Sequence, residues 1–318
     1  MKKSKTEDIV LIGSGPMAAE YVKVLKALGR NFSVVGLGKD SANTFQNETG
    51  VPVITGGINK WLKETKSIPY TAIVAVGEKD LGTVTLTLLN AGVRKILVEK
   101  PGGFNLTEIE KVAKTAKLRE AKVYVGYNRR FYASVQKAKE IIRKDGGVKS
   151  FNFEFTEWSH IISDLNKAPG VKEQWFLHNS THVLDMAFFL GGWPEKLSAF
   201  QAGKLTWHPS GSIYAGSGVS ENDALFSYQA NWEAPGRWSV EVLTNKHRLI
   251  FRPLEKLFIQ AIGSVTIEEV ILEDRYDVEF KPGLYKQVEA FLSGSPKNLC
   301  IIEEQAAHVD IYKQIAGY

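Results

Sequence analysis

The chain has 318 residues and a formal net charge of +5, with 44% hydrophobic and 24% charged residues. This near-average composition excludes disordered and collagen-like chains, and no apolar run approaches the ~20 residues that a membrane-spanning helix needs. The length favours about two domains. Because the lysines are interspersed with acidic residues and accompany no recognition motif, we expect neither nucleic acid nor a membrane as a partner.

The amino terminus predicts no export. Residues 1–8 run directly into the apolar stretch Ile9–Ile12, which is too short for the core of a signal peptide. The single cysteine, Cys300, cannot form an internal disulfide, which fits a reducing compartment. We therefore expect a cytoplasmic protein.

Within residues 1–126, short apolar runs alternate with segments of helical period, as a buried parallel sheet covered by helices requires. The expected strands are Ile9–Ile12, Phe32–Gly36, Ala72–Val76, Lys95–Glu99 and Lys122–Val125, and the expected helices include Ala18–Leu28 and Leu106–Glu120. This order predicts an N-terminal, NAD(P)-binding Rossmann domain of α/β class with a doubly wound parallel sheet.

Residues 127–318 have a different pattern, because Phe151–Thr156 alternates apolar with polar residues at period two. Further strands are expected at Ala224–Trp232, Trp238–Thr244, Arg248–Arg252, Lys256–Ile262 and Ser264–Leu272, and helices at Ala133–Lys144, His178–Leu190, Leu284–Leu292 and Glu303–Ile315. This pattern predicts a C-terminal α/β domain with an open, mostly antiparallel sheet for substrate binding and oligomerisation. Its last helix could pack back on the first domain.

A glycine turn follows the first strand and opens a helix, which is the context expected of a dinucleotide fingerprint. Gly13 permits the tight turn, Gly15 lets the backbone approach a pyrophosphate, and Ala18 keeps the helix close to the strand. Free N–H groups at the helix start attract phosphate. The predicted cofactor-binding residues of this turn are Gly13, Ser14, Gly15, Pro16, Met17 and Ala18. A turn that merely requires small residues is the alternative.

The end of the second strand bears on the choice of cofactor. NAD-preferring domains carry an acidic residue there, whereas this sequence has Gly38 or Lys39 at that position. Lys39 with Ser41 could hold a 2′-phosphate, which favours NADP, although Asp40 keeps NAD possible. The other residues expected to line the cofactor are Gly38, Val76, Gly77, Glu99 and Lys100.

A charged pair and a proline, Glu99-Lys100-Pro101, end the fourth expected strand. Ligands of doubly wound sheets bind outside the carboxyl ends of the strands, so Lys100 lies where a nicotinamide and its substrate would meet. Pro101 favours an extended conformation at Lys100. A cation there can hydrogen-bond the reacting oxygen, which predicts that Lys100 is catalytic. A solvated lysine at the strand end is the alternative.

With these motifs the sequence resembles the Gfo/Idh/MocA family of oxidoreductases over nearly its whole length. The resemblance rests on the glycine turn, on Glu99-Lys100-Pro101, on the segment Gly126–Phe131 and on a helix carrying His182 and Asp185. It implies hydride transfer between NADP(H) and a secondary alcohol or ketone of a sugar, cyclitol, sugar nucleotide or sugar acid. It also implies a homodimer or homotetramer, and places Tyr127 beside the nicotinamide.

The resemblance assigns the histidine helix to the substrate. Helical spacing places His178, His182 and Asp185 on one face. His182 would exchange the proton of the substrate hydroxyl, and Asp185 matches an acidic position of the family. The family's aspartate four residues before the histidine is His178 here, so His178 would shape the substrate site and Asn179 would supply the missing polar contact. Histidines four apart could also bind zinc, but no glutamate base lies between them and we expect no metal.

Two more residues are expected to contact substrate. Arg129 matches the family's first arginine and could hold a carboxylate or phosphate, or else form an interdomain salt bridge. Trp158 could line a sugar site or pack in the core.

Two other functions remain open from the sequence. An enzyme with tightly bound NAD(H) could use transient oxidation for elimination or glycoside hydrolysis. A non-catalytic dinucleotide-binding sensor is the other alternative, but a sensor needs neither Lys100 nor His182, so their presence favours chemistry.

Overall fold

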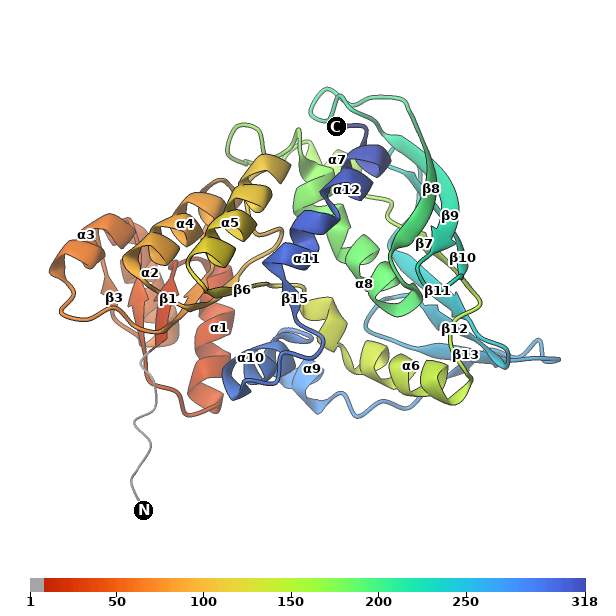
Figure 1. Ribbon diagram of the computed structural model, residues 1–318, viewed down its shortest axis with the longest axis horizontal. Coiled ribbons are helices and arrows are strands. Elements are labelled where there is room, and N and C mark those ends of the chain that lie inside the picture. The colour runs from red at the N-terminus through yellow and green to blue at the C-terminus, as the bar shows by residue number, and fades with distance from the viewer. Residues whose placement is uncertain (1–8) are drawn as a thin grey trace, which may run out of the picture. The chain divides into compact units, whose positions relative to one another are not determined.

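The computed structural model describes residues 9–318, which fold into two compact units (Figure 1). Unit 1 comprises the described residues up to Tyr127 together with Glu279–Ala307, and unit 2 comprises Asn128–Val278 and His308–Tyr318. The division therefore differs from a single cut after residue 126, because a later segment of about thirty residues returns to unit 1.

Unit 1 contains a seven-stranded sheet in the order β15-β6-β5-β4-β1-β2-β3. Its strands are β1 (Ile9–Ile12), β2 (Phe32–Val35), β3 (Val53–Ile54), β4 (Thr71–Val74), β5 (Lys95–Val98), β6 (Lys122–Val125) and β15 (Cys300–Ile301). Strands β1 to β6 are parallel, and β15 pairs antiparallel with β6 at the edge. The order of the parallel strands confirms the predicted Rossmann fold, with its switch point between β1 and β4.

Helices cover the sheet of unit 1, because β1 and β4 are buried at every position. These helices are α1 (Pro16–Ala27), α2 (Lys39–Thr49), α3 (Gly57–Glu64), α4 (Leu81–Ala91), α5 (Leu106–Leu118), α10 (Leu284–Ser293) and α11 (Ile302–Ala307), with a 3₁₀ turn η1 (Glu78–Asp80). The returning segment packs α10 against α1 and α11 against α5. Its strand β15 also supplies the hydrogen-bonding partner of β6, whose edge would otherwise be open.

Unit 2 contains an eight-stranded sheet in the order β14-β13-β12-β11-β7-β10-β9-β8. Its strands are β7 (Ser150–Glu154), β8 (Pro194–Ala202), β9 (Ile213–Ser220), β10 (Leu225–Asn231), β11 (Ser239–Leu243), β12 (His247–Phe251), β13 (Phe258–Ala261) and β14 (Glu268–Glu269). All neighbours pair antiparallel except β7 and β10, which are parallel. This arrangement confirms the predicted open, mostly antiparallel sheet.

Helix α8 (Thr181–Gly191) covers one face of this sheet (Figure 1). Phe153 on β7 lies under it, with its ring 5.3 Å from that of Phe188 in an edge-to-face contact. The other helical segments of unit 2 are η2 (Asn128–Phe131), α6 (Ala133–Lys144), α7 (Ser159–Ile162), the π-helical turn η3 (Phe176–Ser180) and α12 (Val309–Ala316), and α9 (Arg275–Glu279) ends at the unit boundary. Aromatic packing between α8 and β7 thus forms the core of unit 2.

Two strands of unit 2, β8 and β9, were not expected from the sequence. Strand β9 contains glycines, which are more typical of loops. These glycines are required because aromatic rings of β10 lie directly over them. A Cβ at Gly216 would come within 2.3 Å of the Tyr228 ring, and one at Gly218 within 2.6 Å of the Phe226 ring. Small residues in this strand therefore make room for aromatic ones in the next.

Two expected elements of the carboxyl-terminal third were partly wrong. The expected strand Ser264–Leu272 contains only the short β14, and Val265 in it remains 93% exposed, so no packing surface fixes the rest. The expected helix Glu303–Ile315 is interrupted at His308, whose ring stacks on Trp193 with 3.3 Å between centroids. Only its first half, α11, belongs to unit 1.

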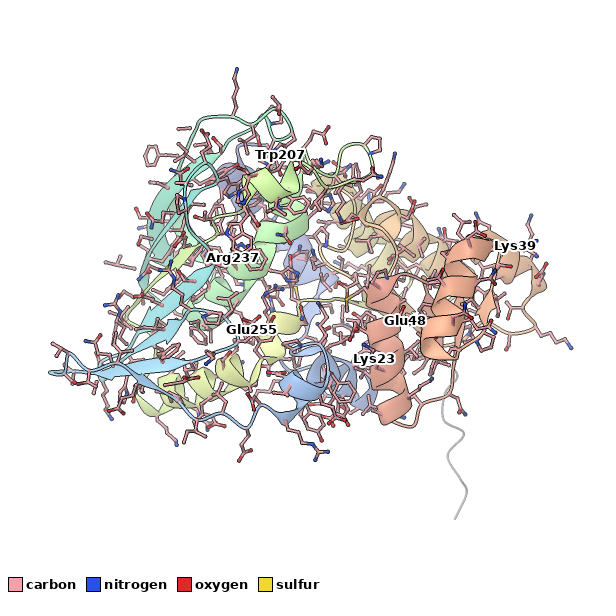
Figure 2. The ribbon with its side chains drawn as sticks, turned by 180° about the vertical axis from the view of Figure 1, so that it is seen from behind. Lys23, Lys39, Glu48, Trp207, Arg237 and Glu255 are labelled. Carbon is pink, nitrogen blue, oxygen red and sulfur yellow. The ribbon has the colours of Figure 1, made fainter. Side chains whose placement is uncertain are left out.

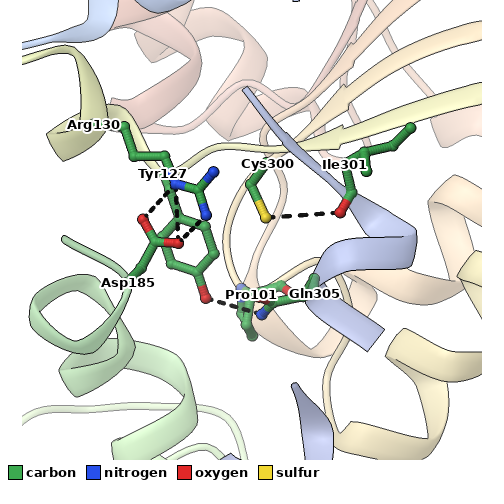
Figure 3. Close-up of polar contacts among 7 residues, drawn as sticks. All are labelled: Pro101, Tyr127, Arg130, Asp185, Cys300, Ile301 and Gln305. Atoms are coloured by element: carbon green, nitrogen blue, oxygen red, sulfur yellow. Dashed lines mark hydrogen bonds and ion pairs between the residues drawn. The ribbon is translucent and has the colours of Figure 1, made fainter. Parts of the chain in front are cut away.

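A buried ion pair joins η2 to α8 inside unit 2 (Figure 3). The Arg130 guanidinium donates from Nε and Nη2 to both oxygens of Asp185, at 2.6 to 3.1 Å. The two side chains are 3% and 0% exposed. Because neither charge is solvated, each depends on the other.

Asp185→Asn would leave a buried guanidinium without its counter-charge, so we predict a loss of about 3 kcal/mol or more in the free energy of unfolding. Urea denaturation would measure it. Glu241→Gln is the matched control, since it breaks an exposed pair with Arg248 and should cost less than about 1 kcal/mol. Equal losses in the two variants would contradict the assignment.

Candidate active site

The glycine turn lies at the switch point of the Rossmann sheet. Gly13 donates its N–H to Val35 O of β2 at 2.8 Å, and its φ of 125° lies in the region that favours glycine. A Cβ at Gly13 would come within 2.1 Å of Ala75 O, just beyond β4. Only glycine therefore lets the chain leave β1 between its two neighbouring strands.

The start of α1 is open to a ligand. Helix α1 begins at Pro16, Gly15 precedes it, and no side chain caps the first N–H groups. A Cβ at Gly15 would meet no atom within 4 Å, whereas Ala18 is fully buried against the sheet. Uncapped N–H groups beside open space fit a pyrophosphate, which the turn Gly13–Ala18 would hold.

The end of β2 meets this turn closely. A Cβ at Gly36 would lie 2.7 Å from Ser14 Oγ, a requirement that the sequence pattern did not reveal. Ser14 Oγ in turn lies 3.4 Å from Ser41 Oγ, so the structure brings these two expected cofactor residues together.

Ser41 belongs to the first turn of α2, with Gly38 preceding the helix and Lys39 as its first residue. No side chain caps this helix start, and Lys39 is exposed there (Figure 2). The helix dipole, a serine hydroxyl and a lysine thus share one location, which suits a phosphate group. Asp40 is also exposed at this helix start.

Val76 and Gly77 follow β4 on the same edge of the sheet. The bond from Ala75 N to Ile12 O, at 2.8 Å, extends the pairing of β4 with β1 up to this point. Gly77 is exposed, with no atom within 4 Å of a Cβ built on it. Both expected residues therefore lie beside the glycine turn.

The Glu99-Lys100-Pro101 segment follows β5 directly. Glu99 Oε1 accepts a 2.7 Å hydrogen bond from the Tyr21 hydroxyl of α1. Burial raises the pKa of Glu99, while the Tyr21 hydrogen bond and the neighbouring Lys100 oppose that rise. Gly126 leaves room for the carboxylate, because a Cβ there would be 3.3 Å from Glu99 Oε1. The carboxylate expected to line the cofactor thus fixes the position of the residue before Lys100.

Gln305 holds the other side of this segment (Figure 3). Its Nε2 donates to Pro101 O at 3.2 Å and to the Tyr127 hydroxyl at 2.9 Å. Gln305 is fully buried and Tyr127 is 1% exposed. The sequence analysis missed Gln305, since nothing in an acidic helical segment marks one glutamine as a partner of a loop two hundred residues away.

The histidine helix of unit 2 begins differently from the expectation. The Thr181 N–H bonds Phe176 O, five residues back, so His178 lies in the π-helical turn η3 and His182 in α8. Such a turn adds a residue and changes the faces predicted from α-helical spacing. His178 and His182 are buried, with 2% and 8% exposure.

Asp185 forms a buried ion pair in unit 2. It was expected to bind substrate, but its carboxylate is fully buried and both of its oxygens accept from Arg130. Its role in the structure is to hold η2 against α8.

A buried glutamate that the sequence analysis missed lies under η3. Glu157 accepts hydrogen bonds from Asn179 Nδ2 at 3.0 and 3.1 Å and from Ser180 Oγ at 2.8 Å. Burial raises the pKa of Glu157 to about 7, although Ser180, Arg237 and Asn179 lower it. The amide of Asn179, expected to contact substrate, is therefore occupied by Glu157. The position of Glu157, just after a period-two strand, was the available signal.

An aromatic and cationic cluster lies in the same unit. The Trp238 ring has the Arg129 guanidinium 4.9 Å from its centroid and the Arg237 guanidinium at 4.4 Å. Arg237 also lies 4.8 Å from the Trp158 ring, which is half exposed. The His182 ring is 6.3 Å from the Trp238 ring. Three expected substrate-site residues, Arg129, Trp158 and His182, are thus joined through Trp238.

Among residues 9–318 no three His, Cys, Asp or Glu side chains gather as a metal site would require. No helix in the same range is long and apolar enough to span a membrane.

A glycine turn at the Rossmann switch point and a lysine at the end of β5 define a dinucleotide-dependent oxidoreductase. Residues 8–127 match the family model described as "Oxidoreductase family, NAD-binding Rossmann fold", which is that of Gfo/Idh/MocA. Residues 8–127 are thus similar to the Rossmann domain of the Gfo/Idh/MocA oxidoreductases, in agreement with the sequence resemblance. No curated protein matches the chain.

Solved structures resemble the chain over nearly its full length. A levoglucosan dehydrogenase in complex with NADH and L-sorbose is 18% identical with a TM-score of 0.77, covering 98% of this chain and 96% of its own. UDP-N-acetylglucosamine 3-dehydrogenase from Acidithiobacillus ferrooxidans is 16% identical, with a TM-score of 0.74 and coverage of 98% and 97%. A putative NADPH-dependent oxidoreductase from Desulfitobacterium hafniense is 17% identical, with a TM-score of 0.74 and coverage of 98% and 94%. At these identities the likeness establishes the fold.

The raised pKa of Glu157 predicts a pH dependence of stability. In the unfolded chain this carboxyl titrates near 4.5, and in the folded protein at about 7. The folded state therefore binds more protons between these values, and the stability that Glu157 contributes below pH 4.5 is lost as the pH rises through 7. Relative to Glu157→Gln, the wild type should lose roughly 3 kcal/mol between pH 4.5 and 8, measured by urea denaturation. A pH-independent difference between the two proteins would show that the carboxyl titrates normally.

Proposed function

We propose that the protein catalyses reversible hydride transfer between NADP(H) and a secondary alcohol or ketone of a sugar, cyclitol, sugar nucleotide or sugar acid. The observation that carries this proposal is the Lys100 backbone, fixed on one side by the Glu99–Tyr21 bond and on the other by Gln305 on Pro101 O. A lysine held so firmly at the ligand-binding edge of the sheet suits a reacting centre. Structural neighbours named as sugar and sugar-nucleotide dehydrogenases support the substrate class.

The proposed reaction has two parts, hydride transfer at the substrate carbon and proton transfer at the oxygen bonded to it. A dinucleotide held by the turn Gly13–Ala18 would supply the hydride chemistry, in either direction. Lys100 would donate a hydrogen bond to the reacting oxygen and stabilise its developing negative charge. His182 would take the hydroxyl proton in oxidation and return it in reduction. Each residue thus acts on the oxygen while the carbon loses or gains hydride.

Lys100→Ala should lower kcat by about 10²- to 10⁴-fold, because it removes the cation at the reacting oxygen. Cofactor affinity should change little, as measured by the quenching of protein fluorescence. Lys114→Ala, an exposed charge on α5, is the control and should turn over normally. Near-normal turnover in Lys100→Ala would refute this mechanism.

We propose NADP as the preferred cofactor, with NAD as a weaker alternative. The support is the grouping of Lys39, Ser41 and Ser14 at the uncapped start of α2, where a 2′-phosphate would find a cation, hydroxyls and a helix dipole. A related fold is named as NADPH-dependent, and another was solved with NADH.

Lys39→Asp should reverse this preference, since it removes a cation and places a carboxylate where ribose hydroxyls would bind. The ratio of kcat/KM for NADPH to that for NADH should fall at least about tenfold, as one charge-assisted contact contributes that much. Lys63→Asp on the exposed side of α3 makes the same change in net charge and should leave the ratio unaltered. A wild type that binds both cofactors equally would refute the phosphate site.

We further propose a cytoplasmic homodimer or homotetramer that associates through the open face of the unit 2 sheet. Phe200 on β8 and Leu225 on β10 are 69% and 62% exposed, which is costly unless another surface covers them. The lone cysteine, Cys300, is reduced and buried, in keeping with a reducing compartment.

A further inference from the structure

Two guanidinium groups and an indole N–H form a cluster of hydrogen-bond donors around Trp238. The Nε of Arg129 is buried without a hydrogen-bond partner among residues 9–318, and its guanidinium lies over the rings of Tyr132 and Trp238. The indole Nε1 of Trp238, itself 7% exposed, also lacks an acceptor among these residues. Two strong donors therefore face no acceptor from the described chain.

Arg237 is the second cation of the cluster. Arg237 lies against the same indole and is 45% exposed, with its nearest carboxylate, Glu157, at 3.7 Å. Glu157 also accepts hydrogen bonds from Asn179 and Ser180, so Arg237 shares this carboxylate with two other donors. Burial lowers the pKa of Arg129 and Arg237 lowers it further, whereas Tyr132, Glu255 and Glu157 oppose this shift. Two guanidinium groups beside one ring repel each other, so an anion bound between them would be stabilised by both.

Oxyanions match this donor set. A guanidinium offers parallel N–H groups that fit a carboxylate or phosphate, and an indole face suits the apolar side of a sugar ring. His182, the proposed proton carrier, lies 6.3 Å from the same indole between ring centroids. The donors and the proton carrier therefore border one ring within unit 2.

We infer that Arg129, Arg237 and Trp238 bind an oxyanion on the substrate, so that the substrates are sugar derivatives bearing a carboxylate or phosphate rather than neutral sugars. This inference rests on the proposed function, because it assigns the substrate class of the same site.

The test compares matched substrates. A panel of hexoses, each as the neutral sugar, its uronate and its 6-phosphate, would be assayed with NADP⁺ and NAD⁺. The acidic member of an accepted set should have a kcat/KM at least about tenfold above that of the neutral member. A preference for the uronate or for the 6-phosphate identifies which oxyanion the site takes.

Two arginine variants locate the effect. Arg129→Gln and Arg237→Gln should each lower kcat/KM for the acidic substrate by about 10- to 100-fold, mainly through KM, and leave the neutral substrate within about twofold. Arg248→Gln, an exposed arginine paired with Glu241 on the sheet, is the control. Because Arg237 is largely exposed, its variant should fold even if the Arg129 variant does not.

The outcomes separate this inference from the proposed function. Equal use of neutral and acidic members, or equal losses on both in the arginine variants, would overturn the inference while leaving the oxidoreductase assignment intact. If no member of the panel reacts, calorimetric titration with D-glucuronate and with inorganic phosphate tests directly whether the protein binds an oxyanion. Binding that is lost in Arg237→Gln but kept in Arg248→Gln supports the oxyanion site, and equal or absent binding in the wild type and both variants overturns it.

Discussion

The hydrogen bond between Tyr21 and Glu99 joins the two parts of unit 1 on which a redox reaction depends. Tyr21 lies in α1, the helix whose start would receive a pyrophosphate in the proposed function, and Glu99 immediately precedes Lys100. One 2.7 Å contact therefore fixes the distance between the cofactor helix and the proposed catalytic strand end. Gly126 contributes by lacking a side chain where the Glu99 carboxylate lies. A shift of either element would separate the phosphate cradle from the lysine.

Unit 2 uses a buried carboxylate in a similar way. Glu157 holds Asn179 and Ser180, the last residues of the π-helical turn, and α8 with His182 follows directly. The extra residue in that turn changes the direction in which the preceding side chains point, and Glu157 compensates its irregular geometry with hydrogen bonds. Irregular backbone before the histidine is thus stabilised by one acidic side chain. The same acid faces Arg237, so it links the histidine helix to the cationic cluster.

Sequence reasoning predicted the local features and missed those that depend on distant partners. The glycine turn and Lys100 are encoded by short motifs at strand ends, where neighbours in sequence are also neighbours in space. Gln305 and Glu157 act on residues that are far away or in irregular segments, and no spacing rule connects them. The ion pair of Asp185 with Arg130, fifty-five residues earlier in the chain, was missed for the same reason. A single sequence gives the residue type at each of these positions, but it does not show which residues are in contact.

The return of residues 279–307 to unit 1 has a consequence for synthesis. Strand β15 closes the edge of β6, and α10 and α11 cover α1 and α5, so the Rossmann unit lacks part of its own surface until these residues exist. When only the first 127 residues of the nascent chain have emerged from the ribosome, the edge of β6 has no pairing partner. Unit 2 must be almost entirely made before the cofactor-binding unit can finish folding. A fragment ending at Tyr127 would therefore lack the strand that pairs with β6 and the two helices that cover α1 and α5.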